Sequence, residues 1–170
     1  EAGLPLIGVE FSSSRYAFND HDRFTPDELG FGWLLKGIDD ESRPFTGRRA
    51  ILQERAQGSS RWRTVGLAVD GHAFEQLHYD AGLIPPKDEP PASWETMLYD
   101  QHGERAGYAT SYAYSPMMQT QIGIARVRPE LADLGSTVHV EVTVNHVYTT
   151  VPATVVPMPF FNPERKTATA

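Results

Sequence analysis

The chain of 170 residues contains no cysteine. This absence excludes disulfide bonds, thiolate zinc sites, cysteine nucleophiles and iron–sulfur clusters held by cysteine. No apolar run approaches the roughly 20 residues that a membrane-spanning helix needs. The start, residues 1–6, also lacks the basic and hydrophobic regions of a signal peptide. We therefore expect a cytoplasmic protein without a membrane partner.

Basic residues are also few, because 15 Lys and Arg stand against 22 Asp and Glu, which gives a formal net charge of -7. Nucleic acids attract a basic surface, so we expect no nucleic-acid partner. His139 and Glu141 would share one strand face, but no third ligand follows at a recognisable spacing, so we expect no metal site. No phosphate-binding glycine loop, dinucleotide fingerprint or serine nucleophile elbow is present.

What the chain does contain is an ordinary globular composition, 40% hydrophobic and 22% charged. Its length suits one domain, or one domain with part of another. It begins at Glu1 without methionine. We therefore expect a processed product, a fragment or one part of a larger protein.

The first third of the chain mixes strand, loop and helix signals. Ile7, Val9 and Phe11 alternate with polar or small residues, which predicts a half-buried strand, and residues 12–23 predict a loop. The aromatic-glycine run 29–35 has the pattern of a strand. Residues 47–57 predict a helix with Thr46 as N-cap and an end at Gly58. This helix lies in the one locally basic region, which would attract an anionic tail or simply be solvated.

The remainder of the chain has a β pattern. Strands are predicted around residues 65–69, in a hairpin of 97–100 with 104–114, and in a hairpin of 138–144 with 147–156 that turns at Asn145 and His146. The proline-rich stretch 81–93 predicts a loop. Tyr108, Thr110, Tyr112 and Tyr114 would share a face, for packing across strands or for binding an aromatic substrate.

Several short motifs follow one another in order: EAGLPL at residues 1–6, TPDE at 25–28, LGFGW at 29–33, FTGRRA at 45–50, GYATS at 107–111 and PMPFFNP at 157–163. This series resembles the glycine-cleavage T-protein family of tetrahydrofolate-dependent one-carbon transferases. The resemblance covers most of the chain. No single motif is specific, and the ordered series carries the assignment.

The resemblance implies an α+β fold, in which the end of a folate-binding α/β domain is followed by a C-terminal antiparallel β-barrel. The expected boundaries are 1–58 for the closing segment of the folate-binding domain with its linking helix, 59–163 for the barrel and 164–170 for a frayed tail. The family's acidic catalytic residue lies upstream of the glutamate that opens this chain. We therefore expect an N-terminal companion segment or subunit, and no activity of this chain alone.

The implied function is transfer of a methyl or methylene group from an O-, N- or S-linked small-molecule donor to tetrahydrofolate. Arg15, Tyr16 and Phe18 resemble a loop of folate-dependent aryl O-demethylases, which favours an aryl ether as donor. The alternatives are an aminomethyltransferase of the glycine-cleavage type and a non-catalytic folate-binding protein. Relatives of the last kind carry a cysteine-containing motif that is absent here. An interaction barrel without folate affinity is a further alternative.

Four residues are candidates for the site. The resemblance implies that Glu1 holds the pterin ring, since a carboxylate can accept two parallel hydrogen bonds from its aminopyrimidine edge. Arg15 would pair with a carboxylate of folate or substrate, and Tyr16 would donate its hydroxyl to the leaving group. Trp33 would line the folate cavity. The alternative roles are a solvated Glu1, a Tyr16 that anchors its loop, and a structural Trp33 between domains.

Overall fold

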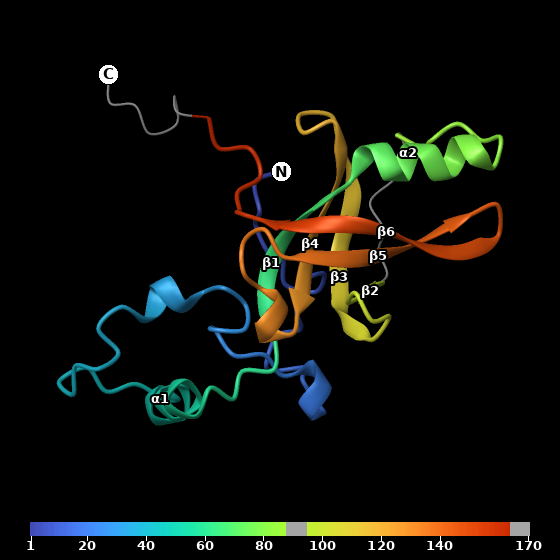
Figure 1. Ribbon diagram of the computed structural model, residues 1–170. Helices are drawn as coiled ribbons and strands as arrows, with labels where there is room; N and C mark the ends of the chain where they lie inside the picture. The colour runs from blue at the N-terminus through green and yellow to red at the C-terminus, as the bar shows by residue number, and fades with distance from the viewer. Residues whose placement is uncertain (88–94, 164–170) are drawn as a thin grey trace, which may run out of the picture.

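A computed structural model describes residues 1–87 and 95–163 (Figure 1). Its centre is a closed barrel of six strands in the order β1-β4-β3-β2-β5-β6, with every neighbouring pair antiparallel. The strands are β1 (Arg63–Val69), β2 (Thr96–Tyr99), β3 (Arg105–Ser115), β4 (Thr120–Val127), β5 (Thr137–Val144) and β6 (Val147–Val156). This confirms the antiparallel barrel that the sequence predicts.

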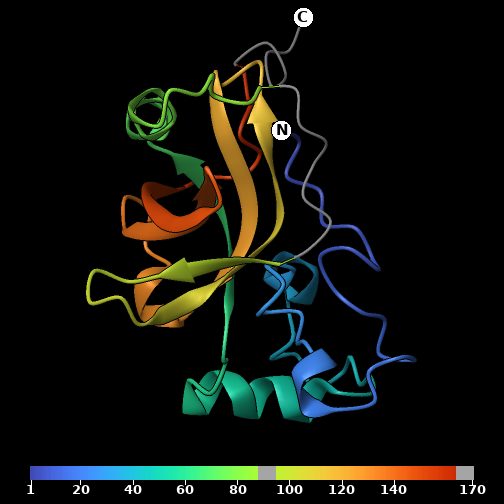
Figure 2. The ribbon, with the colours of Figure 1, turned by 90° about the vertical axis from the view of Figure 1, so that its right-hand side faces the viewer.

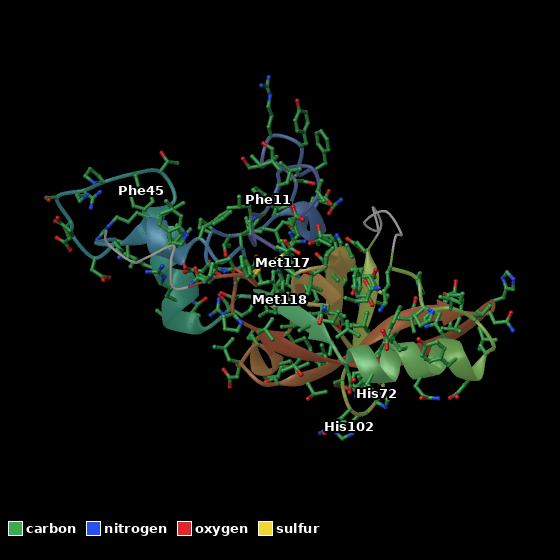
Figure 3. All side chains as sticks on the ribbon, turned by 90° about the horizontal axis from the view of Figure 1, so that it is seen from above. Phe11, Phe45, His72, His102, Met117 and Met118 are labelled. Atoms are coloured by element: carbon green, nitrogen blue, oxygen red, sulfur yellow. The ribbon has the colours of Figure 1, made fainter. Side chains whose placement is uncertain are left out.

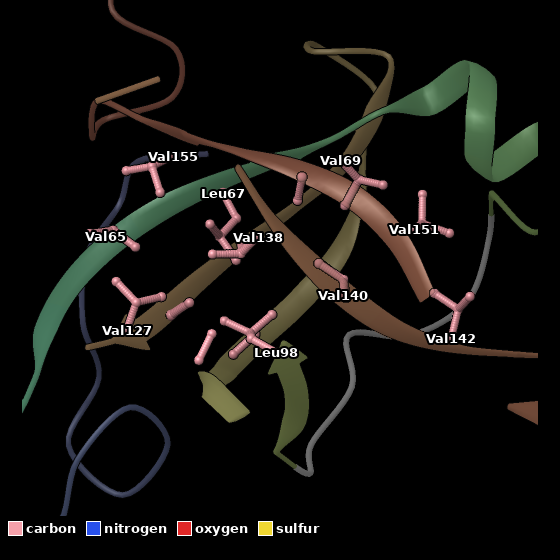
Figure 4. Close-up of a cluster of buried hydrophobic side chains, with 14 of the residues drawn as sticks. Val65, Leu67, Val69, Leu98, Val127, Val138, Val140, Val142, Val151 and Val155 are labelled. Atoms are coloured by element: carbon pink, nitrogen blue, oxygen red, sulfur yellow. The ribbon is translucent and has the colours of Figure 1, made fainter. Parts of the chain in front are cut away.

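The barrel interior is filled mainly by valine, together with alanine and leucine (Figure 4). Alternate residues of β5, Val138 to Val144, are buried, while the residues between them are less buried. Leu67 of β1 and Leu98 of β2 are fully buried in the same cluster. The period-two alternation of β-branched residues therefore places one face of each strand in the core, as expected for a half-buried sheet.

Two local irregularities shape β3 and the last hairpin. The register of β3 against β4 shifts between Ala109 and Ser111, which is a β-bulge. The predicted single tyrosine face is therefore wrong: Tyr112 packs against the barrel core, whereas Tyr108 lies outside that cluster and is covered by Trp62, with ring centroids 5.6 Å apart. The turn between β5 and β6 is confirmed at Asn145 and His146, which both have positive φ.

Two helices flank the barrel at opposite ends (Figures 1 and 2). The predicted helix is confirmed as α1 (Arg48–Gln57) and ends at Gly58 in the left-handed conformation. The predicted cap is wrong, since Gly47 is the N-cap residue and no side chain caps this end. No helix was predicted over α2 (Gly71–Asp80), whose N-cap Asp70 accepts a hydrogen bond from the Ala73 backbone N–H.

The two strands predicted before α1 are wrong. Ile7 and Phe11 share only an isolated bridge, and the backbone turns at Leu6, whose carbonyl accepts from the Val9 and Glu10 N–H groups. Burial is opposite to the expected pattern, because Ile7 is 63% exposed and Glu10 is buried. Residues 29–35 instead end in a short 3-10 helix, η2 (Gly32–Leu35).

Two predictions lie partly or wholly outside the described residues. The proline-rich loop 81–93 is described only to residue 87, and that part contains no helix or strand after α2. The tail 164–170 is outside the description. Of the helices that the structure describes, none is long and apolar enough to cross a membrane.

Candidate functional site

The first residues of the chain lie along the outside of β3. Glu1 Oε1 accepts a hydrogen bond of 2.6 Å from the Ser115 hydroxyl and a longer one of 3.3 Å from the Met117 N–H. Further along the same strand, the Ser111 hydroxyl donates to the Glu10 carboxylate, which also accepts from the Leu6 N–H. Two carboxylates of the N-terminal segment are thus bonded to two serines of one strand.

The closing segment of the chain contacts the same first residues. The Glu1 carbonyl accepts from the Phe160 N–H at 3.0 Å. A side chain at Gly3 would lie 2.9 Å from the Met158 Cβ, and Gly3 has a φ of +65°, so glycine is needed for this approach. The EAGLPL and PMPFFNP motifs therefore meet in space, which Figure 1 shows as the N-terminus beside the end of β6.

The electrostatics of Glu1 favour its charged form. The hydrogen bond from Ser115 holds the pKa of the Glu1 carboxyl below its usual value, and the Met117 N–H acts in the same direction. Among the described residues, no hydrogen bond reaches Oε2. Glu1 is therefore an anion with one oxygen fixed by the protein and the other available to a donor.

The other candidate residues are exposed and separate. Tyr16 and Trp33 expose 63% and 64% of their surface, and Arg15 is exposed on the same loop as Tyr16. The loop is closed locally by the Tyr16 N–H donating to the Ser13 carbonyl at 2.8 Å. Within the described part of the chain, no hydrogen bond or ring contact joins these three side chains to Glu1. All four predicted residues are thus exposed, and of these Glu1 is the one whose side chain is fixed by hydrogen bonds to β3 and the residue after it, Ser115 and Met117.

A cleft of about 680 Å³ lies between α1 and residues 20–28. Its buried carboxylates are both in use: Glu28 accepts from the Thr25 and Arg61 N–H groups, and Glu54 accepts from the Thr25 hydroxyl at 2.9 Å. Arg55 binds Asp27 through two hydrogen bonds of 2.6 and 2.8 Å. Two arginines of the basic region, Arg48 and Arg55, therefore hold α1 in place through their contacts with the Ile38 carbonyl and Asp27.

The predicted site omitted the partners of Glu1 and the buried Glu10. Ser115 is 114 positions from Glu1 in sequence, and nothing in the local pattern links the two. Glu10 was placed on the polar face of a strand because its neighbours alternate. The family motif at residues 107–111 lies on β3, but it predicts no contact between this strand and Glu1.

Comparisons with known proteins bear on the fold and the family of the chain. Residues 81–162, which include β2 to β6, match the family model described as the glycine cleavage T-protein C-terminal barrel domain. The aminomethyltransferase of Synechococcus elongatus is 31% identical over 161 residues, which are 95% of this chain and 34% of that protein. The aminomethyltransferase of Francisella tularensis is 32% identical over 136 residues, 78% of this chain and 29% of that protein.

A solved structure shares the fold. The crystal structure of glycine cleavage system aminomethyltransferase T from Bartonella henselae superposes with a TM-score of 0.66 at 21% identity, over 94% of this chain and 36% of that one. The chain therefore spans about a third of the length of the relatives that it matches.

Proposed function

We propose, on the premise that this chain belongs to the glycine-cleavage T-protein superfamily, that it forms the C-terminal portion of a tetrahydrofolate-dependent aminomethyltransferase. The observation that carries the proposal is the anionic Glu1, fixed by Ser115 and Met117 at the junction of the two terminal motifs. A carboxylate held in this way can accept paired hydrogen bonds from a planar donor edge.

The amine donor is preferred to the aryl ether. The loop with Arg15, Tyr16 and Phe18 favoured ether demethylation, but the matched relatives are named aminomethyltransferases, and no described contact links this loop to Glu1. The comparisons thus support the amine-cleaving alternative and lend the demethylase reading no support. The transferred group is accordingly an aminomethyl-derived one-carbon unit.

The carboxylate of Glu1, although exposed, has the chemistry to hold a reduced pterin. When bound, tetrahydrofolate supplies the N5 amine that accepts the one-carbon unit. Glu1 would hold the aminopyrimidine edge, while the Ser115 hydroxyl keeps Oε1 in place and keeps the carboxyl ionised. The Phe160 N–H fixes the backbone of Glu1 and so limits the directions in which its side chain can reach. In preorganised binding sites, the side chain that binds the ligand is typically held in place by such contacts with neighbouring residues.

The site would include Arg15, Tyr16 and Trp33 only when another polypeptide surface covers them. Arg15 would pair with a carboxylate, Tyr16 would donate to the departing heteroatom and Trp33 would close the folate cavity. Their exposure means that another polypeptide surface must enclose them before they can act on a bound molecule.

We propose that an N-terminal companion segment or subunit provides this cover. The first 45 residues expose nine large apolar side chains, and a large amount of exposed apolar surface is typical of an interface. They are Leu4, Leu6, Ile7, Val9, Tyr16, Phe18, Trp33, Leu34 and Phe45. Figure 3 shows Phe45 on the side away from the barrel strands. The companion would also supply the catalytic acid, so this chain alone would bind folate weakly and would not turn over.

Calorimetric titration of tetrahydrofolate tests the proposal, with the chain alone and with the chain co-expressed with its companion. We expect tight binding only in the complex. Glu1→Gln should weaken it at least about tenfold, since two charge-assisted hydrogen bonds contribute about 1.5–3 kcal/mol each. The matched control is Glu41→Gln, which changes an exposed glutamate. Equal affinity of the Glu1→Gln and Glu41→Gln complexes would remove Glu1 from the site.

The same complexes distinguish the catalytic from the non-catalytic alternative. Release of a one-carbon unit from an aminomethyl donor, measured as methylenetetrahydrofolate, is expected of the complex. A methoxyaryl donor should give none. Folate binding that depends on Glu1 but is accompanied by no turnover of either donor would favour a non-catalytic folate-binding protein.

A further inference from the structure

Arg126 is a buried cation near the end of strand β4, directly after the apolar residues Ile122 to Ala125. Its side chain is only 4% exposed. One guanidinium nitrogen donates to the Tyr108 hydroxyl at 2.9 Å, and the group lies 3.9 Å from the centre of the Phe24 ring. Its Nε has no hydrogen-bond partner, and among the described residues no carboxylate oxygen lies within 4.0 Å of it.

These contacts compensate the buried charge only in part. Removing a cation from water costs several kcal/mol unless an anion or a full set of acceptors replaces the solvent. A desolvated cation–π contact contributes about 2 kcal/mol, and one neutral hydrogen bond contributes less. An arginine in this state is an incomplete ion pair, with a planar fork suited to a carboxylate.

Arg126 lines a cleft of about 100 Å³ between the barrel wall and the N-terminal segment. Since about 10–15 Å³ of such space holds one water, the cleft has room for a molecule of several non-hydrogen atoms. Tyr108 and Thr110 line the barrel side of the cleft. The cleft is separate from the Glu1 contacts, because Glu1, Ser115 and Met117 are not among its lining residues.

The charges around the cleft decide what class of molecule fits. Glu10, Asp22 and Glu95 line it together with Arg126, so three carboxylates accompany one guanidinium. His21 is the other lining residue that can carry a positive charge. A ligand with only a carboxylate would pair with Arg126 but would be repelled by the three lining carboxylates. A ligand with only an amine would pair with these carboxylates but would be repelled by Arg126. A small molecule that carries both groups can pair with both kinds of charge.

We propose that this cleft binds a small zwitterionic amino acid, with its carboxylate on Arg126 and its ammonium group on the lining carboxylates of Asp22 and Glu95. The carboxylate supplies the acceptor that Nε lacks, and Phe24 and Tyr108 hold the guanidinium in place to receive it. The site does not depend on Glu1 or on folate chemistry.

Nuclear magnetic resonance titration of the ¹⁵N-labelled chain with glycine, acetate and methylammonium tests this. Glycine should shift the Arg126 Nε–H resonance and the backbone amides of β4, because it has both charges and five non-hydrogen atoms. Ligand efficiency limits so small a molecule to roughly micromolar affinity at best. Acetate and methylammonium, each with one of the two charges, should bind at least about tenfold more weakly than glycine.

Variants separate a binding role from a structural one. Arg126→Gln should abolish the glycine-dependent shifts, and Arg49→Gln, at an exposed arginine, should leave them unchanged. Because Arg126→Gln could disturb packing, Glu95→Gln provides a second variant: Glu95 is exposed, and its loss should weaken glycine binding several-fold without changing the melting temperature. The proposal is overturned if glycine causes no shift at Arg126, if acetate binds as well as glycine, or if Glu95→Gln binds glycine like the wild type.

Discussion

The TPDE motif contains a buried carboxylate whose removal should weaken the whole junction between the N-terminal segment and the barrel. Glu28 is 2% exposed, and its carboxylate accepts from the Thr25 N–H at 3.1 Å and from the Arg61 N–H at 2.7 Å. The Glu28 N–H in turn donates to the Thr25 hydroxyl, which is the reciprocal arrangement of a capping box. The Glu28 carbonyl accepts hydrogen bonds from the hydroxyl and the N–H of Thr64, the second residue of β1.

The cost of Glu28→Gln follows from these bonds. Each charge-assisted bond contributes about 1.5–3 kcal/mol, and glutamine keeps one acceptor oxygen while turning an amide donor towards one of the two N–H groups. The ion pair with Arg61, at 3.5 Å, adds little because Arg61 is 43% exposed. We therefore expect a loss of roughly 2–3 kcal/mol in the free energy of unfolding, about a 30- to 150-fold change in the folding equilibrium.

Urea unfolding followed by tryptophan fluorescence measures this difference. The dependence of unfolding free energy on urea should keep its slope, since the buried surface changes little. Glu41→Gln, at an exposed position, is the control and should change stability by less than about 0.5 kcal/mol. If Glu28→Gln lost no more than this control, the carboxylate would not hold the junction and the reasoning would be refuted.

Two further predictions concern the core and the acid limit of stability. Leu98→Ala should lower the free energy of unfolding in urea by roughly 3–4 kcal/mol, because removing a fully buried side chain leaves a cavity. Leu134→Ala, at a 68% exposed position, should lower it by less than about 1 kcal/mol. Similar losses for the two variants would contradict the closed core. The hydrogen bond from Arg55 holds the pKa of Asp27 below its usual value, so the stability that this pair adds is fully present above about pH 4 and is lost as pH falls through the lower folded value. Asp27→Asn should lower the melting temperature at pH 7 and flatten its fall below pH 4, and Asp133→Asn should do neither.

The barrel could be predicted from the sequence because its signals are local and repeated. Alternating valines in 138–144, the Asn145–His146 turn and the 97–114 hairpin each point to the same architecture. The segments before α1 could not be predicted in this way. Ile7 and Val9 alternate as in a strand, but their backbone is turned by the bonding of Glu10 to Leu6, and their apolar side chains remain exposed.

From the sequence, single residues of the candidate site could be proposed but their contacts could not. The resemblance points to Glu1, yet the bonds that fix Glu1 come from Ser115 and Phe160, more than a hundred positions away. Local pattern carries no signal for such long-range pairs. For Arg126 a signal was present, because a charged residue interrupts the apolar strand 122–127, but a strand argument alone assigns it to the solvent face rather than to a buried cleft.

Closure of the barrel explains why a residue at position 1 can be held accurately. Glu1 is fixed by Ser115 at the end of β3 and by Phe160 beyond the end of β6, two strands that are not neighbours in the barrel order. The distance between these two anchors is constant only if every strand between them keeps its register, which a closed sheet without free edges ensures. The closed barrel therefore sets the position of the Glu1 carboxylate, which is the group that we propose to bind the pterin.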